Sequence, residues 1–138
     1  MAHQRETIRK AFVTKLTGLT TTSVRVYRSR VYPMGSANLP GLIVYATEEE
    51  SAAPNMGASN QARELTVVVE GYAKTSYTLL DDTLDDIAAE VEAAINLDRT
   101  VSGSVDTCWL ESTEIDLADE GEKPVGVVKL NFKTIYRG

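Results

Sequence analysis

The chain has 138 residues, of which 43% are hydrophobic and 25% charged, a balance typical of one soluble globular domain over residues 1–138. Its 20 acidic residues outnumber its 14 basic residues and give a net charge of −6. This charge opposes tight binding to nucleic acid phosphates but would let DNA slide past. One cysteine excludes an internal disulfide, and no apolar run resembles a membrane span or a secretory signal. We therefore expect no membrane contact and synthesis in a reducing cytoplasm.

An amphipathic helix is predicted over residues 4–16, because apolar side chains recur at the spacing of one helix face. They are Ile8, Ala11, Phe12, Leu16 and, beyond the helix, Leu19. Gly18 stands where it can end the helix. Two strands rich in β-branched and aromatic residues should follow at residues 24–28 and 42–47, with proline and glycine breaks between them.

A mobile loop is predicted over residues 48–60, which are rich in Glu, Ser, Ala, Asn, Gly and Pro. Loops of this length without structure are uncommon in compact domains unless they serve a function. We expect this loop to become ordered on a partner.

The second half of the chain alternates strand and helix patterns. A strand over residues 62–73 should bury the side that carries Leu65, Val67 and Val69. Apolar residues at helical spacing then predict an amphipathic helix over residues 80–96. Two final strands, residues 104–117 and 125–137, should form a long hairpin around an acidic turn that contains glycine.

The length of this hairpin has two explanations. Thirteen residues in a strand span about 43 Å, whereas a compact domain of this size has a radius of gyration of about 14 Å. The hairpin either projects beyond the core as an arm, which would suit an oligomer, or is bent by β-bulges.

Residues that usually carry catalysis or bind metals are scarce. His3, the one histidine, lies next to the N-terminus, and Cys108 is expected to be a small buried side chain. Four aspartates at the start of the second helix could serve a hydrolase or a metal site, but acids at a helix N-terminus more simply form a solvated face. They are Asp81, Asp82, Asp85 and Asp86. We expect no catalytic residue, no metal and no cofactor.

A local basic group is formed by Arg25, Arg28 and Arg30, which alternate with Tyr27 and Tyr32. Such a group could contact RNA or phosphate. In an acidic protein, however, arginines more often pair with carboxylates across an interface, and we favour that interpretation.

The order of these segments resembles the tail-terminator proteins of long-tailed phages, including the lambda-type minor tail protein family and its relatives in prophages and gene-transfer particles. The similar features are the N-terminal helix, the segment VYRSRVYP at residues 26–33, and the segment LPGLIVY at residues 39–45 with acids after it. The loop, the strand from Glu64 to Val69, the acidic helix and the C-terminal hairpin follow in the same order.

The resemblance implies an α+β fold, with two amphipathic helices packed on a mixed, mainly antiparallel sheet that ends in a long hairpin. It also implies a non-enzymatic virion protein, assembled in the host cytoplasm, that forms a homo-hexameric ring at the head-proximal end of the tail. The ring would cap the tail tube, end tube polymerisation, present a docking surface to the head–tail connector protein, and let DNA pass through its lumen. Candidate residues for subunit or tube contacts are Arg28, Arg30, Tyr32, Glu48, Glu49, Glu50, Asn55, Met56, Asp119, Glu120, Glu122 and Lys123.

Three alternatives stay open at the level of sequence. A head–tail connector or neck protein shares the small size and the ring assembly. An acidic inhibitor that mimics DNA would need more than the present excess of six acids. A small hydrolase would have to use the aspartates of the second helix.

Overall fold

The computed structural model describes residues 4–28, 40–51, 62–75, 77–118 and 125–137, which form two helices and five strands. The helices are α1 (Gln4–Leu16) and α2 (Tyr77–Leu97). The strands are β1 (Val26–Tyr27), β2 (Gly41–Ser51), β3 (Ala62–Lys74), β4 (Thr107–Ala118) and β5 (Val125–Arg137).

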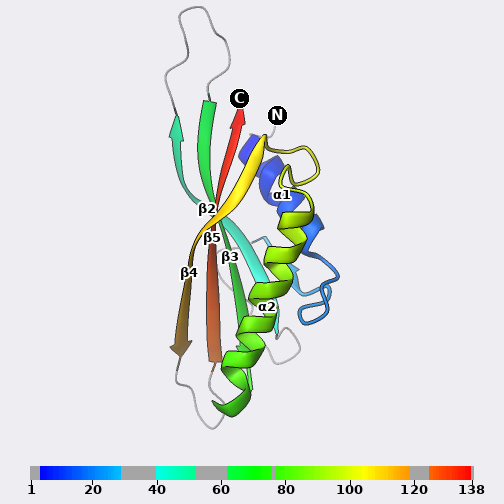
Figure 1. Cartoon of the computed structure of the whole chain (residues 1–138). Coiled ribbons are helices and arrows are strands. Elements are labelled where there is room, and N and C mark those ends of the chain that lie inside the picture. The colour runs from blue at the N-terminus through cyan, green and yellow to red at the C-terminus, as the bar shows by residue number, and fades with distance from the viewer. Residues whose placement is uncertain (1–3, 29–39, 52–61, 76, 119–124, 138) are drawn as a thin grey trace, which may run out of the picture.

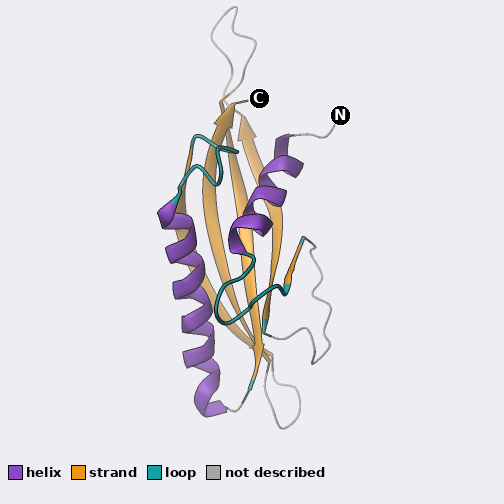
Figure 2. Ribbon diagram, turned by 90° about the vertical axis from the view of Figure 1, so that its right-hand side faces the viewer, coloured by secondary structure: helices purple, strands orange, loops and turns teal. Residues whose placement is uncertain are grey.

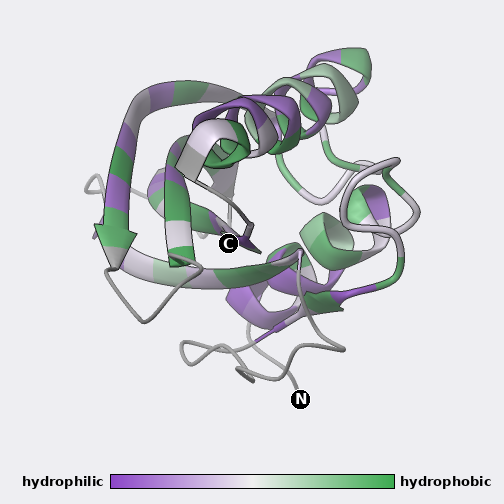
Figure 3. Ribbon diagram, turned by 90° about the horizontal axis from the view of Figure 1, so that it is seen from below, coloured by the Kyte–Doolittle hydropathy of each residue, from purple (hydrophilic) through white to green (hydrophobic). Residues whose placement is uncertain are grey.

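The strands form one mixed sheet in the order β1-β2-β3-β5-β4 (Figure 1). Strand β1 pairs with β2 in parallel, and all other pairs are antiparallel. Both helices lie on one face of the sheet (Figure 2). Viewed along the strands, the sheet curves around them (Figure 3). The predicted α+β fold, with two helices on a mainly antiparallel sheet and a C-terminal hairpin, is therefore confirmed.

Helix α1 occupies the predicted residues because one of its faces is apolar. Ile8, Phe12 and Leu16 are fully buried against the sheet side of the core. Phe12 packs against Phe132 of β5, with the ring centroids 6.1 Å apart. The helix ends before Gly18, whose φ of 95° is a left-handed conformation that glycine adopts without a steric penalty.

Helix α2 packs close to the sheet because two glycines lie beneath it. A Cβ atom on Gly71 of β3 would come within 2.5 Å of Ile87 Cγ2, and one on Gly126 of β5 within 2.8 Å of Leu84 Cδ1. The buried face of α2 has the predicted helical spacing. It consists of Leu80, Leu84, Ile87, Val91 and Ile95.

The C-terminal hairpin is not a free arm. Strand β5 pairs with β3 over its whole length, from Val125↔Lys74 to Arg137↔Ala62. Strand β4 contains a bulge between Leu110 and Ser112. Of the two explanations for the long strands, the second therefore holds: the strands are bulged and curved within the sheet.

Two sequence-based expectations about the strands were wrong in detail. Strand β1 is shorter than residues 24–28, because backbone hydrogen bonds place Val24 and Arg25 in turns. Strand β2 continues through residues 48–51, which were expected to begin the mobile loop, because they pair with β3. Residues 52–61 lie outside the described residues. In β3 the predicted burial of Leu65, Val67 and Val69 is confirmed. Val68 is buried as well, on the second face, where its cross-strand neighbours are Tyr45 and Asn131.

Candidate assembly interface

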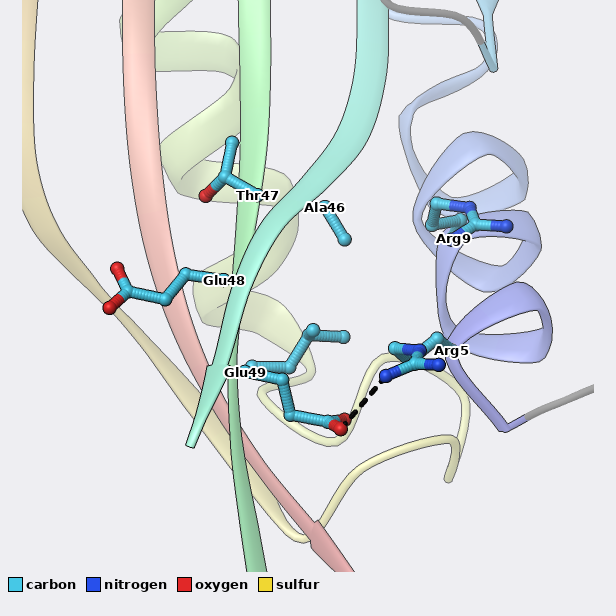
Figure 4. A pocket seen from close by; sticks show the side chains of 7 residues that line it. Arg5, Arg9, Ala46, Thr47, Glu48 and Glu49 are labelled. Atoms are coloured by element: carbon cyan, nitrogen blue, oxygen red, sulfur yellow. Dashed lines mark hydrogen bonds and ion pairs between the residues drawn. The ribbon is translucent and has the colours of Figure 1, made fainter. Parts of the chain in front are cut away.

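A bulge in β2 separates three consecutive glutamates onto opposite faces of the sheet. The register with β3 shifts between Ala46 and Glu48, so that Glu49 pairs with Leu65 and points toward the helices. Glu48 points away on the other side of the strand (Figure 4). Without this extra residue the side chains would have kept alternating, and Glu48, two residues after Ala46, would have pointed to the inner face. The bulge therefore turns Glu49 inward.

The inward carboxylate of Glu49 binds side chains from three other elements. Arg5 of α1 places its Nη1 atom 2.9 Å from Glu49 Oε2, and Arg63 of β3 places its Nη1 atom 3.2 Å from the same oxygen. The Tyr136 hydroxyl of β5 donates a hydrogen bond to Glu49 Oε1. We call these four residues the Glu49 cluster. It joins the start of α1 to one end of the sheet.

The cluster perturbs the titration of two of its members. Burial alone would raise the pKa of Glu49, but the Tyr136 hydroxyl and the two guanidinium groups outweigh burial and hold that pKa below its ordinary value. Burial, and then the neighbouring carboxylate, raise the pKa of Tyr136 to about 12. Glu49 is thus ionised and Tyr136 protonated at neutral pH, as a structural ion pair requires.

A shallow pocket of about 260 Å³ lies between α1 and β2, beside the cluster. Figure 4 shows Arg5 and Arg9 on the helix side and Glu49 facing Arg5 across the gap. The lining residues are Arg5, Arg9, Ala46, Thr47, Glu48, Glu49 and Leu65. These side chains offer charge and hydrogen bonds but no nucleophile paired with a base.

The candidate interface residues that the structure describes do not form one site. Arg28 is exposed, and its Nη1 atom lies 3.6 Å from Glu6 Oε1 of α1. Glu48 and Glu50 are exposed, whereas Glu49 is only 11% exposed and belongs to its cluster. The other candidates lie outside the described residues. They are Arg30, Tyr32, Asn55, Met56, Asp119, Glu120, Glu122 and Lys123.

The two described arginines of the expected basic group, Arg25 and Arg28, make different contacts. Arg25 holds the chain locally, since its Nε atom donates to the Pro40 carbonyl at 2.6 Å and its Nη2 atom to the Thr21 carbonyl at 3.2 Å. Arg28 instead joins Lys10 around Glu6, with 3.1 Å between Lys10 Nζ and Glu6 Oε1. Sequence reasoning missed Lys10, because contact between α1 and β1 is a tertiary feature.

The remaining candidates for catalysis or metal binding are the four aspartates of α2 and Cys108. All four aspartates of α2 are exposed, and no group of three or more His, Cys, Asp or Glu residues in the described ranges could hold a metal ion. Cys108 is buried as expected, and burial raises the pKa of its thiol to about 11. No helix among these residues is long and apolar enough to cross a membrane.

Comparison with known proteins gives a match of fold. A chain in the structure titled "Virion of native gene transfer agent (GTA) particle" superposes with a TM-score of 0.57 and 14% sequence identity. The match covers 95% of this chain and 95% of that chain. No family model and no curated protein matches the sequence. The chain therefore has the fold of a protein found in a phage-like particle.

Proposed function

We propose that this protein is a non-enzymatic structural component of a phage-like virion that forms a ring at the head-proximal end of the tail. The fold match to a gene transfer agent virion chain spans 95% of both chains and is the observation that supports the assignment to a virion. The ring and its place at the tail end rest on the order of sequence segments, which resembles that of tail terminators.

The finer role that we propose is tail termination. A homo-hexameric ring would dock on the last layer of the tail tube with one face and present a different face to the head–tail connector protein. The next tube subunit would find no matching surface, so polymerisation would stop without any chemical step. The excess of acidic residues would disfavour phosphate binding and let DNA pass through the lumen.

We also propose contacts for the candidate interface residues. Arg28 and Arg30 would bridge neighbouring subunits, and the segments around Asn55, Met56 and residues 119–123 would contact the tube or the connector. Glu48 and Glu50 are exposed and available for such contacts. We assign Glu49 to internal stabilisation instead, because it is bound by Arg5 and Arg63.

The test is a tube-length assay with the tail tube protein of the same phage or particle. Tube protein is polymerised alone or with a small molar amount of this protein, and tube lengths and ends are measured by negative-stain microscopy. We expect shorter tubes, each closed at one end by a ring. Heat-denatured protein is the control.

A neck or connector protein is the second candidate, since the virion match fits it equally well. Such a protein would bind the head-side connector and leave the length distribution of tubes unchanged. That result would contradict tail termination and keep the broader assignment to a virion protein.

A further inference from the structure

Strand β4 has one edge without a strand partner in the described structure. It is the last strand in the order β1-β2-β3-β5-β4 and pairs only with β5 there. Figure 1 shows β4 along one side of the molecule, away from α1. Its 12 residues make it a long edge strand. Proteins usually protect such edges with lysine, proline, bulges or covering elements, and the bulge between Leu110 and Ser112 is one such device in β4.

The far half of β4 is uncovered on the helix side of the sheet. Helix α2 packs over Gly71 of β3 and Gly126 of β5, and every side chain from Glu111 to Leu117 is exposed. Ile115 is 49% exposed and Leu117 is 58% exposed, although their cross-strand neighbours Val128 and Gly126 are buried. Two large apolar side chains therefore extend the apolar surface of the core beyond α2 and are exposed to solvent.

The same half of the strand is acidic. Strand β4 contains Glu111, Glu114 and Asp116 but no lysine or arginine. Glu111 pairs with Lys133 of β5, with 3.5 Å between Lys133 Nζ and Glu111 Oε2. Glu114 is the cross-strand neighbour of Lys129 and accepts a hydrogen bond from Asn131 Nδ2 at 3.4 Å, but neither Glu114 nor Asp116 forms an ion pair within the described residues. An occupant of this edge should therefore combine an apolar contact with positive charge.

The opposite side of this chain has that combination. Val24, next to the edge strand β1, is 71% exposed. Lys10 of α1 and Arg28, which follows β1, are exposed, and both contact the carboxylate of Glu6. These two bases and one acid form a locally positive group.

We propose that β4 of one copy docks against the α1–β1 side of a second copy of this chain. Ile115 and Leu117, on one face of the strand, would cover Val24, while Glu114 and Asp116, on its other face, would face Lys10 and Arg28. The two surfaces lie at opposite edges of the sheet, so the contact is head-to-tail, and repeated contacts of this kind close into a ring when the rotation fits. The inference rests on the proposed ring and names the surfaces that build it.

Two charge-reversal variants and their mixture test the contact. The acid-reversed variant carries Glu114→Lys and Asp116→Lys, and the base-reversed variant carries Lys10→Glu and Arg28→Glu. Each variant alone would juxtapose like charges, and we expect its self-association to be weaker by at least about tenfold. In an equimolar mixture every contact regains opposite charges, so assembly should return to the wild-type level.

The assay is sedimentation velocity over a concentration series, with circular dichroism to verify folding. Asp81→Lys with Asp85→Lys is the matched control, because it makes the same charge change on the exposed face of α2. This control should assemble like the wild type. Added salt should weaken wild-type assembly, since exposed charges are screened.

The possible results separate this inference from the proposed function. Loss of assembly in both variants with recovery in the mixture supports the contact. Wild-type assembly of either variant alone overturns it, even if those rings still cap tubes. An acid-reversed variant that assembles normally but fails to cap tubes would assign β4 to another protein and also overturn the inference. A wild type that stays monomeric at the highest concentration overturns the contact, while tube capping by that sample would still support tail termination.

Discussion

Gly71 sets the distance between helix α2 and the sheet, and its substitution by alanine should destabilise the protein. The added Cβ would lie 2.5 Å from Ile87 Cγ2 and 3.1 Å from Val128 Cγ1, whereas ordinary contacts begin at 3.4 Å. Ile87 Cγ2 is attached directly to Cβ, so it cannot move away without the helix backbone. The helix would have to rise by about 1 Å, because interiors are close-packed.

Overpacking of this kind costs about 1–3 kcal/mol, and we expect Gly71→Ala to cost about 2–3 kcal/mol. Gly126→Ala is the matched comparison. Its Cβ would meet the δ-methyl groups of Leu84 and Leu80, at 2.8 Å and 3.1 Å, and these can rotate away. We expect about 1 kcal/mol there. Both changes reduce the entropy of the unfolded chain similarly, so that effect cancels in the comparison.

Thermal and urea unfolding followed by circular dichroism measure both costs. An unfolding entropy of about 2.1 cal/mol/K per residue makes 1 kcal/mol equal to about 3–4 °C for this chain, so Gly71→Ala should lower the melting temperature by about 6–10 °C. Adding Ile87→Leu, which removes the β-branch, should restore part of the loss. An unchanged melting temperature for Gly71→Ala, or an equal loss for Gly126→Ala, would refute the close approach of α2.

Two further predictions concern charged groups that hold segments together. Glu49→Gln should cost about 1–2 kcal/mol at pH 7, since hydrogen bonds to charged groups are strong but Arg5 is partly exposed. Because folding lowers the pKa of Glu49 from its ordinary 4.5, the stabilisation is complete above pH 4.5 and is lost as pH falls through the folded value. Urea unfolding from pH 7 to pH 3 should therefore show the free energies of unfolding of the wild type and Glu49→Gln converging. A constant difference between the two would contradict this. Asp98→Ala should lower the melting temperature and speed amide exchange in residues 99–105, because Asp98 accepts hydrogen bonds from the Thr100 and Ser102 amides at 3.1 Å and 2.9 Å. Unchanged exchange there would be the contrary result, and Asp98→Asn should be intermediate.

The helices could be predicted from the sequence because their signals are local. The apolar spacing around Ile8 and Phe12 gave the observed bounds of α1, and the left-handed Gly18 follows its end. The longer repeat of α2 likewise identified its buried face. Both patterns depend on residues three or four apart, which share a helix face.

The end of β2 and the positions of its glutamates could not be predicted from such local patterns. Glutamate is unfavourable in strands, so the residues after Thr47 suggested a loop. Pairing with β3 keeps Glu48, Glu49 and Glu50 in the strand, and the bulge sends only Glu49 inward. Both effects depend on a partner strand that lies more than ten residues further along the chain.

The exposed edge of β4 was missed for a related reason. Alternation in the sequence indicated a hairpin but not that β5 would lie between β3 and β4. Only this order leaves β4 beyond the reach of α2 and exposes Ile115 and Leu117. The absence of lysine from the strand was the available signal, because edge strands commonly carry it.

Ring formation is tested most directly by light-scattering mass combined with negative-stain microscopy of the purified protein, at low and high concentration and with ends of the cognate tail tube present. We expect rings, with a mass near 90 kDa for six copies of the 15.0 kDa chain. A protein that stays a monomer under all these conditions, including in the presence of tube ends, would contradict the proposed function.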